Sequence, residues 1–503
     1  MPIRACSLVG CSVMLVMSSL LVDVAAQTVP FRRIPGMTLK TESFRTDPGW
    51  EGINHRAARN QPPRTIRQDF GFSPDTHHAG GRSPGELGGF VSPAGEAAFY
   101  AKEIASKGLD QPLSASGTLF LDEGGTNLLL GFFNAETVKE WRTPSSIAIR
   151  LNGRGDKFFA YVEYCTAKWR AGGDTTPFPS VTDPNTGRWS LIGFPIRTSL
   201  NWSLHYDPKG NDGRGVVTAI IGDARAVCLL DESHQSDGAT FNRFGILNVV
   251  KSADSGSKIW LDDIVINGAA TEEFSADPQW DGRNNRRTYP SRLVRPWFDF
   301  GFSATHFSGG TETGELGGVI YRGDCRDPEK MASYGDRVGP LSLEKPLKAA
   351  GKLAMTRGVT DSTVLFGFYN SVDSLRSNNS QSDSVPESVL GIHVEGPSSD
   401  GFHVYPVLRS KNAGGAVAPL REFPFIQPDG KSHDWGLDYD PAAEEGRGRI
   451  TVSLDGQAKS WTLPVGLKTQ ATAFDRFGIV TSWIDGNGQE IYWDDVTYTQ
   501  SQD

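Results

Sequence analysis

Apolar and polar residues alternate in short runs along this chain, and turn-forming residues separate the runs. Such runs occupy residues 118–121, 127–133, 146–151, 158–164, 216–221 and 259–266. Alternation with a period of two, bounded by Gly, Asn, Asp and Pro, is typical of β-strands. Residues 96–106 are the best candidate for an amphipathic helix. The pattern therefore predicts an all-β fold of short strands joined by turns.

The chain contains two copies of one sequence unit. The motif FRTDPGW at residues 44–50 recurs as FSADPQW at residues 274–280. Because several such blocks recur in the same order and at a nearly constant offset, we predict a tandem duplication with units at 44–268 and 274–499. The size and strand pattern of each unit favour a large antiparallel β-sandwich of jelly-roll type over a small immunoglobulin-like domain.

Residues 1–27 have the features of a secretory signal peptide, and residues 28–43 form a segment ahead of the first unit. Arg4 gives a positive start, residues 8–22 are mainly apolar, and small residues precede the expected cleavage point. The apolar stretch is short for a bilayer span, and no later run is long enough to cross one. We therefore predict a soluble protein secreted to the periplasm or the cell exterior.

Cysteine content and net charge limit the cofactors and binding partners that fit this chain. Once the leader is removed, Cys165 and Cys228 lie in the same unit and could pair, while Cys325 has no obvious mate. No zinc-type Cys/His spacing and no nucleotide-binding loop occur, so no organic cofactor is expected. The 50 Lys and Arg against 59 Asp and Glu give a net charge of −9, which argues against a nucleic-acid partner. The sequence leaves the oligomeric state open.

The last strand of each unit carries an aspartate in an apolar context. Strict alternation places Asp262 on one face with Trp260, Ile264 and Ile266, and it places Asp494 in the same way in the second unit. A carboxylate in such a position needs a cation, an arginine or backbone donors. A structural Ca²⁺ is one interpretation. Pairing with an arginine, Arg243 or Arg476 respectively, has equal weight.

The endings RFGI followed by IWLDDI, and RFGI followed by IYWDDV, carry a family resemblance. They resemble the last strands of concanavalin-like and jelly-roll carbohydrate modules, including laminarinase-like and 3-keto-glycoside-processing sandwich domains and exported proteins of planctomycete-type bacteria. The resemblance implies a sandwich fold and an extracellular, polysaccharide-related role. The E-x-D-x-x-E strand of laminarinases is missing, so no catalytic residue of that family is transferred.

A glycine-rich block that starts at Asp69 and recurs at Asp299 contains candidate catalytic residues. It brings His77 and Glu86 together in the first unit, and the second unit has the equivalent pair His306 and Glu315. Such a pair could act as acid and base or as metal ligands. The alternative, which we favour, is that the glycines form tight turns and the glutamates cap backbone donors or lie exposed.

Candidate substrate-binding residues are two arginines and four tryptophans. Arg56 and Arg286 could contact sugar hydroxyls or a carboxylate, although an ion pair that ties the first strand to the sandwich, with Glu51 or Asp281, fits them better. The tryptophans found in only one copy could stack on a pyranose, whereas those present in both copies, such as Trp50 and Trp202, are expected in the core. The former are Trp141, Trp169, Trp189 and Trp483.

Three functions fit these observations. The first is a secreted carbohydrate-recognition protein in which tandem lectin-like sandwiches bind a polysaccharide or glycoconjugate with avidity. The second is a glycan-cleaving enzyme, a glycoside hydrolase or polysaccharide lyase, with a His/Glu site. The third is a structural protein of the cell envelope.

Overall fold

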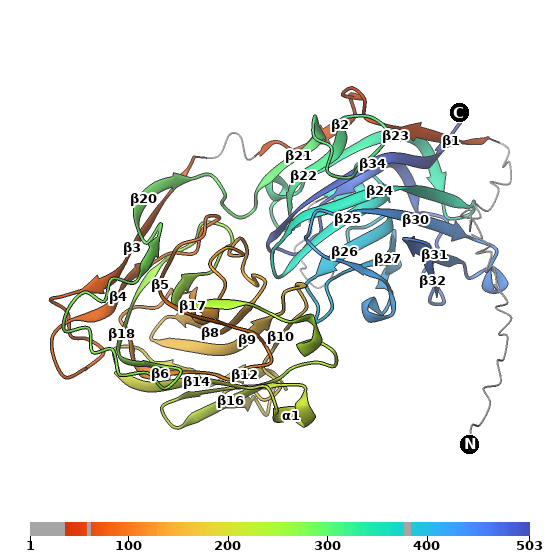
Figure 1. The fold of residues 1–503 in the computed structure, drawn as a ribbon. Coiled ribbons are helices and arrows are strands. Elements are labelled where there is room, and N and C mark those ends of the chain that lie inside the picture. Colours follow the sequence, from red (N-terminus) through yellow and green to blue (C-terminus); the bar gives the residue numbers. More distant parts are fainter. Residues whose placement is uncertain (1–35, 58–61, 126, 377–383, 503) are drawn as a thin grey trace, which may run out of the picture. The chain divides into compact units, whose positions relative to one another are not determined.

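The computed structural model describes residues 36–57, 62–125, 127–376 and 384–502, and almost all of their regular structure is β-strand (Figure 1). Within this part of the chain, the α-helix is limited to the single turn α1 (Gly210–Gly213). The expected signal peptide, 1–27, lies outside the described residues. The predicted all-β class is confirmed.

The strands form two β-sandwiches, each built of two eight-stranded antiparallel sheets. We name them sandwich 1 and sandwich 2. The first sheet of sandwich 1, called the groove sheet below, contains β10 (Ala171–Gly173), β9 (Lys157–Cys165), β8 (Ser146–Arg154), β7 (Asn127–Phe133), β17 (Phe241–Asn248), β5 (Phe99–Lys107) and β19 (Asp281–Arg283) in spatial order, with β13 (Phe194–Pro195) beside β9. Its second sheet contains β16 (Ala224–Leu229), β15 (Val216–Ile221), β14 (Leu200–Asp207), β6 (Leu113–Leu121), β18 (Ser257–Ile266), β4 (Glu86–Val91), β3 (Arg64–Ser73) and β20 (Arg286–Ser291).

Sandwich 2 repeats this order of strands. One sheet contains β21 (Phe298–Ser303), β22 (Glu315–Tyr321), β34 (Gly488–Ser501), β24 (Leu347–Gly358), β30 (Ser432–Asp440), β31 (Arg449–Leu454) and β32 (Gln457–Thr462), with β1 (Met37–Glu42) beside β34. The other contains β2 (Glu51–Ile53), β23 (Ser333–Ser342), β33 (Ala473–Val480), β25 (Ser362–Tyr369), β26 (Val389–Gly396), β27 (Phe402–Ser410) and β28 (Gly414–Val417), with β29 (Phe425–Ile426) beside β27.

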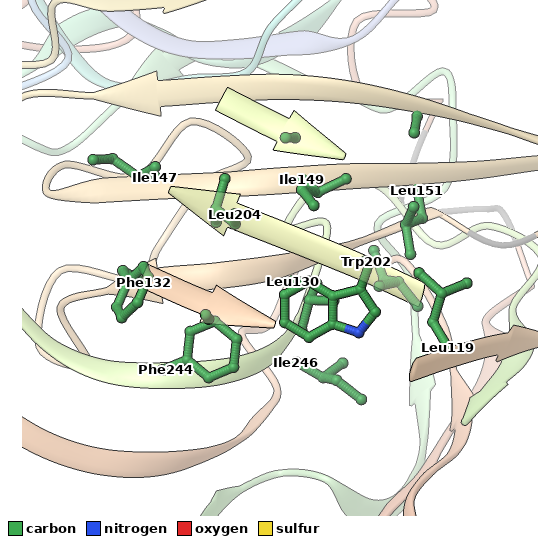
Figure 2. Packing of buried hydrophobic residues seen from close by; sticks show 14 of the residues in the cluster. Leu119, Leu130, Phe132, Ile147, Ile149, Leu151, Trp202, Leu204, Phe244 and Ile246 are labelled. Atoms are coloured by element: carbon green, nitrogen blue, oxygen red, sulfur yellow. The ribbon is translucent and has the colours of Figure 1, made fainter. Parts of the chain in front are cut away.

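The core of sandwich 1 fills the space between its two sheets. Trp202 and Leu204 of β14 face Phe244 of β17, and the rings of Trp202 and Phe244 stack with centroids 6.0 Å apart (Figure 2). Each apolar side chain buried in this way contributes roughly 1.5–3 kcal/mol to folding. Trp202 and its equivalent Trp435 are 2% and 3% exposed, so the prediction that the tryptophans shared by the two copies are core is confirmed.

The helix expected at residues 96–106 is wrong, because most of it forms strand β5. This strand pairs with β17 on one side and β19 on the other. Phe99 and Ala101 pack on one face of the sheet, whereas Tyr100 packs on the other. The Ala, Glu and Lys residues of this stretch favour a helix locally, but strand pairing and burial on both faces override that preference.

The face predicted for Asp262 is also wrong, because a β-bulge interrupts the alternation of β18. The pairing of β18 with β6 shifts between Asp262 and Val265, and Asp263 has a φ of 50°. As a result, Leu261 and Ile264 both point into the core, while Asp262 points away from it. Asp495 has a φ of 46° at the equivalent place in β34.

The folded sandwiches are out of phase with the sequence repeat. Residues 272–291, at the start of the second repeat, complete sandwich 1: β19 pairs with β5 and β20 with β3. Residues 37–57, which span the end of the 28–43 segment and the start of the first repeat, complete sandwich 2: β1 pairs with β34 and β2 with β23. We call these stretches the central closing segment (272–291) and the N-terminal closing segment (37–57).

The two closing segments are equivalent in register but differ in connection. Glu272 bridges Ile264 of β18, and Glu42 pairs with Val496 at the matching position of β34. The central closing segment follows β18 through a short turn at Asn267. The N-terminal closing segment instead precedes sandwich 1 in the chain and closes sandwich 2. The repeat boundaries at residues 44 and 274 therefore do not coincide with the boundaries of the folded sandwiches.

Candidate functional site

The glycine-rich blocks hold their glutamates as backbone caps. Glu86 is fully buried, and its carboxylate accepts hydrogen bonds of 2.8–2.9 Å from the backbone N–H groups of His78 and Ala79. Glu315 accepts the equivalent bonds from Phe307 and Ser308. The side chains of His77 and His306 are exposed. This arrangement favours the turn interpretation of the blocks over an acid–base pair.

Within each block, one glycine lies where a side chain would collide with the closing segment, and another lies where it would collide with the aspartate of the last strand. A Cβ on Gly85 would lie 2.1 Å from the carbonyl oxygen of Phe274 in the central closing segment. A Cβ on Gly81 would lie 1.9 Å from Oδ2 of Asp262. Gly314 and Gly310 make the same approaches in sandwich 2. Because glycine has no side chain, these positions let a closing segment and the aspartate of the last strand approach the backbone of the block closely.

Asp262 and Asp494 keep one oxygen without a hydrogen-bond partner among the described residues. In each, Oδ1 accepts a bond of 2.7 Å from the next backbone N–H, while Oδ2 is buried and unpartnered. Burial raises the pKa of Asp262 to about 6 and that of Asp494 to about 7. Among the described residues, no group of three or more His, Cys, Asp or Glu side chains is placed to hold a metal ion.

The arginines proposed as partners of these aspartates bind elsewhere, so that pairing is wrong. Arg243 forms an ion pair of 2.7 Å with Asp281, and Arg476 forms one of 2.5 Å with Glu51. Asp281 lies in β19 of the central closing segment, which pairs with β5. Glu51 lies in β2 of the N-terminal closing segment, which pairs with β23. These arginines therefore hold the closing segments in place rather than the last strands.

Arg56 and Arg286 also anchor the closing segments. Arg286 Nη1 lies 2.6 Å from Asp69 and Nη2 donates to the Phe72 carbonyl. Arg56 makes the same pair of contacts with Asp299 and with the Phe302 carbonyl. The ion pairs predicted for these arginines therefore exist, but their acidic partners are Asp69 and Asp299 instead of Asp281 and Glu51.

The tryptophans found in one copy have different surroundings. Trp483 is fully buried and donates to the Ser374 carbonyl, which leaves no face for a ligand. Trp169 donates to Glu140 at 2.8 Å and has the Lys139 ammonium over its ring. Trp189, in the separate hairpin of β11 (Ser180–Thr182) and β12 (Trp189–Leu191), is 52% exposed.

A groove lies on the face of the groove sheet that points away from the main core of sandwich 1. Strands β8 and β9 supply its floor, and the β11–β12 hairpin supplies Trp189. Its lining includes Arg142, Arg150, Tyr161, Glu163, Asp174 and Trp189. Charged and aromatic side chains gathered in a concave surface of this kind are typical of ligand sites.

Arg150 organises the floor of the groove. Its Nε donates to Glu163 at 2.7 Å, and its guanidinium lies over the rings of Tyr161 and Trp141, 4.0 and 4.9 Å from their centroids. The second oxygen of Glu163 accepts a 3.0 Å bond from Nε1 of Trp141. Arg142 lines the same groove, and its buried Nε has no hydrogen-bond partner among the described residues.

The two carboxyl groups of the groove have pKa values shifted in opposite directions. Burial raises the pKa of Asp174 to about 7, and the nearby Glu163 adds to the rise. Burial also opposes ionisation of Glu163, but the guanidinium groups of Arg150 and Arg142 outweigh it and hold the pKa of Glu163 below its usual value. The groove therefore combines an acid that is ionised at neutral pH with one whose pKa lies near neutrality.

Sandwich 2 lacks this chemistry at the equivalent positions. The strand registers align Arg150 with His393, Glu163 with Val407 and Asp174 with Ala418. His393 and Ala418 are each 2% exposed and Val407 is fully buried. The stretch 174–199, which carries the β11–β12 hairpin in sandwich 1, corresponds to the shorter stretch 418–431 in sandwich 2. The groove is thus a feature of one copy.

Two charges inside otherwise apolar strands are a sequence signal for this groove. Arg150 and Glu163 interrupt the apolar runs SIAIRL and FFAYVEYC, and charges inside strands buried on both faces need partners. Their presence in one copy only also marks them as differences in otherwise matching strands. The partner of each charge depends on strand register, which the sequence does not provide.

Two further predictions bear on location and cross-linking. Cys165 and Cys228 are both free and buried, so the pairing considered from the sequence does not occur in the structure. No helix in the described ranges is long and apolar enough to cross a bilayer.

The chain matches no family model and no curated protein. Among solved structures it is similar to domains LG4-5 of the mouse laminin alpha1 chain, with 10% identity, a TM-score of 0.21, and coverage of 81% of this chain and 94% of that one. It is also similar to the Emp47p carbohydrate recognition domain (9% identity, TM-score 0.25, 40% and 88% covered) and to the alginate lyase vAL-1 from Chlorella virus (11%, 0.24, 40% and 88%). At such low TM-scores these similarities carry no argument about function.

Proposed function

We propose that the chain is a secreted glycan-binding protein whose binding site is the groove of sandwich 1. The observation that carries the proposal is the exposed Trp189 above a floor of Tyr161, Arg150 and Glu163. A flat aromatic ring can stack on the apolar face of a pyranose, while fixed charged groups read its hydroxyls or a carboxylate. Sandwich 2, in which the equivalent positions are apolar or buried, serves as scaffold.

A binding experiment on the full chain tests this proposal. We expect one or more polysaccharides of a diverse panel to bind, and we expect Trp189→Ala to weaken binding about tenfold, which corresponds to about 1.4 kcal/mol. Phe425→Ala is the matched control, because Phe425 is a 42%-exposed aromatic side chain on sandwich 2. Equal binding by Trp189→Ala and the parent chain would contradict the assignment. Failure of every glycan to bind would favour a structural envelope role instead.

Cleavage of the bound glycan is a second candidate function, favoured by the opposed pKa values of Asp174 and Glu163. Such pairs supply the acid and the base of glycoside hydrolysis. Asp174 would donate a proton to the glycosidic oxygen as its bond to the anomeric carbon breaks. Glu163 would take a proton from the water whose hydroxide joins that carbon. The sequence-based pair of His77 and Glu86 lies outside the lining of this groove, and both oxygens of Glu86 accept backbone bonds.

A reducing-end assay on a bound glycan separates binding from cleavage. Catalysis predicts new reducing ends with the parent chain and a loss of about 100-fold or more with Asp174→Asn. Glu86→Gln serves as the comparison for the His/Glu site. Binding without new reducing ends identifies the protein as a binder alone.

The calcium prediction also stays a proposal. Its support is the buried, unpartnered Oδ2 of Asp262 and of Asp494, since Ca²⁺ takes oxygen ligands. Isothermal titration with CaCl₂, compared between the parent chain and Asp494→Asn, measures it directly. If added Ca²⁺ produces no heat and no shift in melting temperature, the calcium proposal is wrong. Protonation of the two carboxyl groups, whose pKa values are raised, then accounts for their burial.

A further inference from the structure

The N-terminal closing segment binds sandwich 2 by three kinds of contact. Its strands β1 and β2 add to the two sheets through β34 and β23. Phe44 is fully buried and Trp50 is 7% exposed, and the Trp50 ring packs on Tyr334 and Tyr498. Ion pairs complete the contact, including Lys40 with Asp336 at 2.7 Å. The surface of sandwich 2 that receives the segment is called its cradle below.

Sandwich 1 has a cradle with matching contacts for the central closing segment. Phe274 is fully buried and Trp280 is 8% exposed, and the Trp280 ring stacks on Tyr100. Tyr100 donates to Asp277, as Tyr334 donates to Asp47 in sandwich 2. The buried Phe and Trp and the bond from Tyr to Asp thus have counterparts in the two segments, whereas the six-residue pairing of β1 with β34 corresponds to a single bridge between Ile264 and Glu272.

The difference lies in how each segment is tethered. The central closing segment is continuous with β18, so its cradle and its chain belong to the same sandwich. The N-terminal closing segment continues in the chain into β3 of sandwich 1, and only non-covalent contacts join it to sandwich 2. An identical segment from a second molecule makes the same contacts with the same cradle, so exchange costs no contact free energy. The protein concentration then decides whether the sandwich 2 cradle holds the segment of its own chain or that of a second chain.

We propose that this protein pairs with a second copy of itself by reciprocal exchange of residues 37–57. In the pair, the N-terminal closing segment of each copy occupies the sandwich 2 cradle of the other. Two chains are the smallest assembly in which exchange fills every cradle, and a reciprocal pair is closed. The single-chain form dominates at low concentration, because the covalent tether gives its own segment a high effective concentration.

Exchange requires the segment to leave its cradle, and loss of the exposed ion pairs of Glu51 makes a small contribution to that step. The Arg337 and Arg476 guanidinium groups hold the pKa of Glu51 below its usual value. A lowered carboxyl pKa contributes stability above the usual pKa, and this contribution is lost as the pH falls through the lowered value. Acid below the usual carboxyl pKa of about 4.5 therefore loosens the segment and speeds exchange. Exposure of Phe44 and Trp50 in the open state keeps exchange slow at neutral pH.

Two single-cysteine variants report exchange directly. The hydroxyls of Thr41 in β1 and Thr497 in β34 lie 2.9 Å apart and are exposed. Full chains carrying Thr41→Cys, labelled with ¹⁵N, are mixed at high concentration with unlabelled full chains carrying Thr497→Cys. The mixture is held at a pH below the usual carboxyl pKa, returned to neutral pH and oxidised. A disulfide between positions 41 and 497 of different chains, identified by peptide mass spectrometry, reports the exchanged pair when its yield exceeds that of random cross-linking.

A control pair measures random cross-linking. Thr451 and Ser460 face each other at 2.8 Å across β31 and β32, which are adjacent strands of one hairpin. We expect the 41–497 cross-link to exceed the cross-link between Thr451→Cys and Ser460→Cys chains by about tenfold, and to increase with protein concentration. A yield equal to the control overturns the proposal. Thr41→Cys/Thr497→Cys in one chain verifies folding, because it forms the intrachain bridge in dilute solution.

Discussion

Sandwich 1 and sandwich 2 share a scaffold but differ in the surface it carries and in how it is closed. Both keep a buried Phe and Trp on the closing segment and an arginine that reaches the strand of the glycine-rich block. In contrast, the pair of Arg150 and Glu163 has no counterpart in sandwich 2. These shared residues therefore maintain the fold, whereas the charged groups of the candidate site and Trp189 are found in one copy.

The largest effect is expected from truncating the tryptophan of a closing segment. Trp50→Ala and Trp280→Ala each remove a buried indole and should cost about 3–5 kcal/mol of unfolding free energy. The variants should differ in local opening. In Trp50→Ala, hydrogen exchange should rise across the whole N-terminal closing segment. In Trp280→Ala it should rise less across the central closing segment, because the chain connects that segment directly to β18 of the same sandwich. Equal exchange in the two variants would show that the tether makes no difference.

The groove pair should give the next effect. Glu163→Val, the residue at the equivalent place in sandwich 2, leaves the Arg150 guanidinium and the Trp141 N–H without their acceptor. We expect a loss of about 3 kcal/mol in urea unfolding. The double variant Arg150→His/Glu163→Val copies sandwich 2 and should lose less than the single variant. A double variant that loses more would mean that the two side chains do not depend on each other.

Asp174 should give sandwich 1 a pH dependence that sandwich 2 lacks at the matching Ala418. Its pKa rises from about 3.8 unfolded to about 7 folded. Between these values the folded state binds more protons, so stability falls as the pH rises and levels off above about 7. Asp174→Asn should flatten the curve by roughly 2 kcal/mol over pH 4 to 7, after allowance for partial solvation. Part of the pH dependence remains in this variant, because Asp262 and Asp494 also have raised pKa values. A stability–pH curve equal to that of the parent chain would contradict the raised pKa of Asp174.

The smallest effect is expected for the exposed ion pairs of the N-terminal closing segment. Glu51→Gln removes the pairing with Arg337 and Arg476 and should cost less than about 1 kcal/mol, because solvent and salt screen exposed charges. Thermal unfolding at low and high salt measures it. A loss as large as that of Trp50→Ala would show that charge, rather than apolar burial, holds the segment.

The duplication and the all-β class could be predicted from the sequence, because repeats and period-two alternation are local properties. The phase of the sandwiches could not. The motif FRTDPGW shows that residues 44–50 need a cradle like that of residues 274–280, but it does not say which copy provides the cradle. The bulge at Asp262 and Asp263 was missed because strict alternation assumes that no residue is inserted.

The candidate site depended on long-range register even more than the fold did. Arg150 meets Glu163 only because β8 and β9 pair, and Asp174 joins them only because β10 continues that sheet. The tryptophans illustrate the same limit. Trp189 and Trp483 both lie beside polar or glycine-rich sequence, yet Trp189 is 52% exposed and Trp483 is fully buried. Local composition could nominate both residues, and only packing separates them.

The place of the N-terminal closing segment in the chain also affects the order of events during synthesis. Ribosomes make residues 37–57 first, whereas β34, with which they pair, is completed last. At about 5–20 residues per second, the segment exists for on the order of half a minute before its own cradle is complete. The cradle of sandwich 1 is completed earlier, and residues 272–291 fill it. Phe44 and Trp50 therefore stay without their native burial until the end of synthesis.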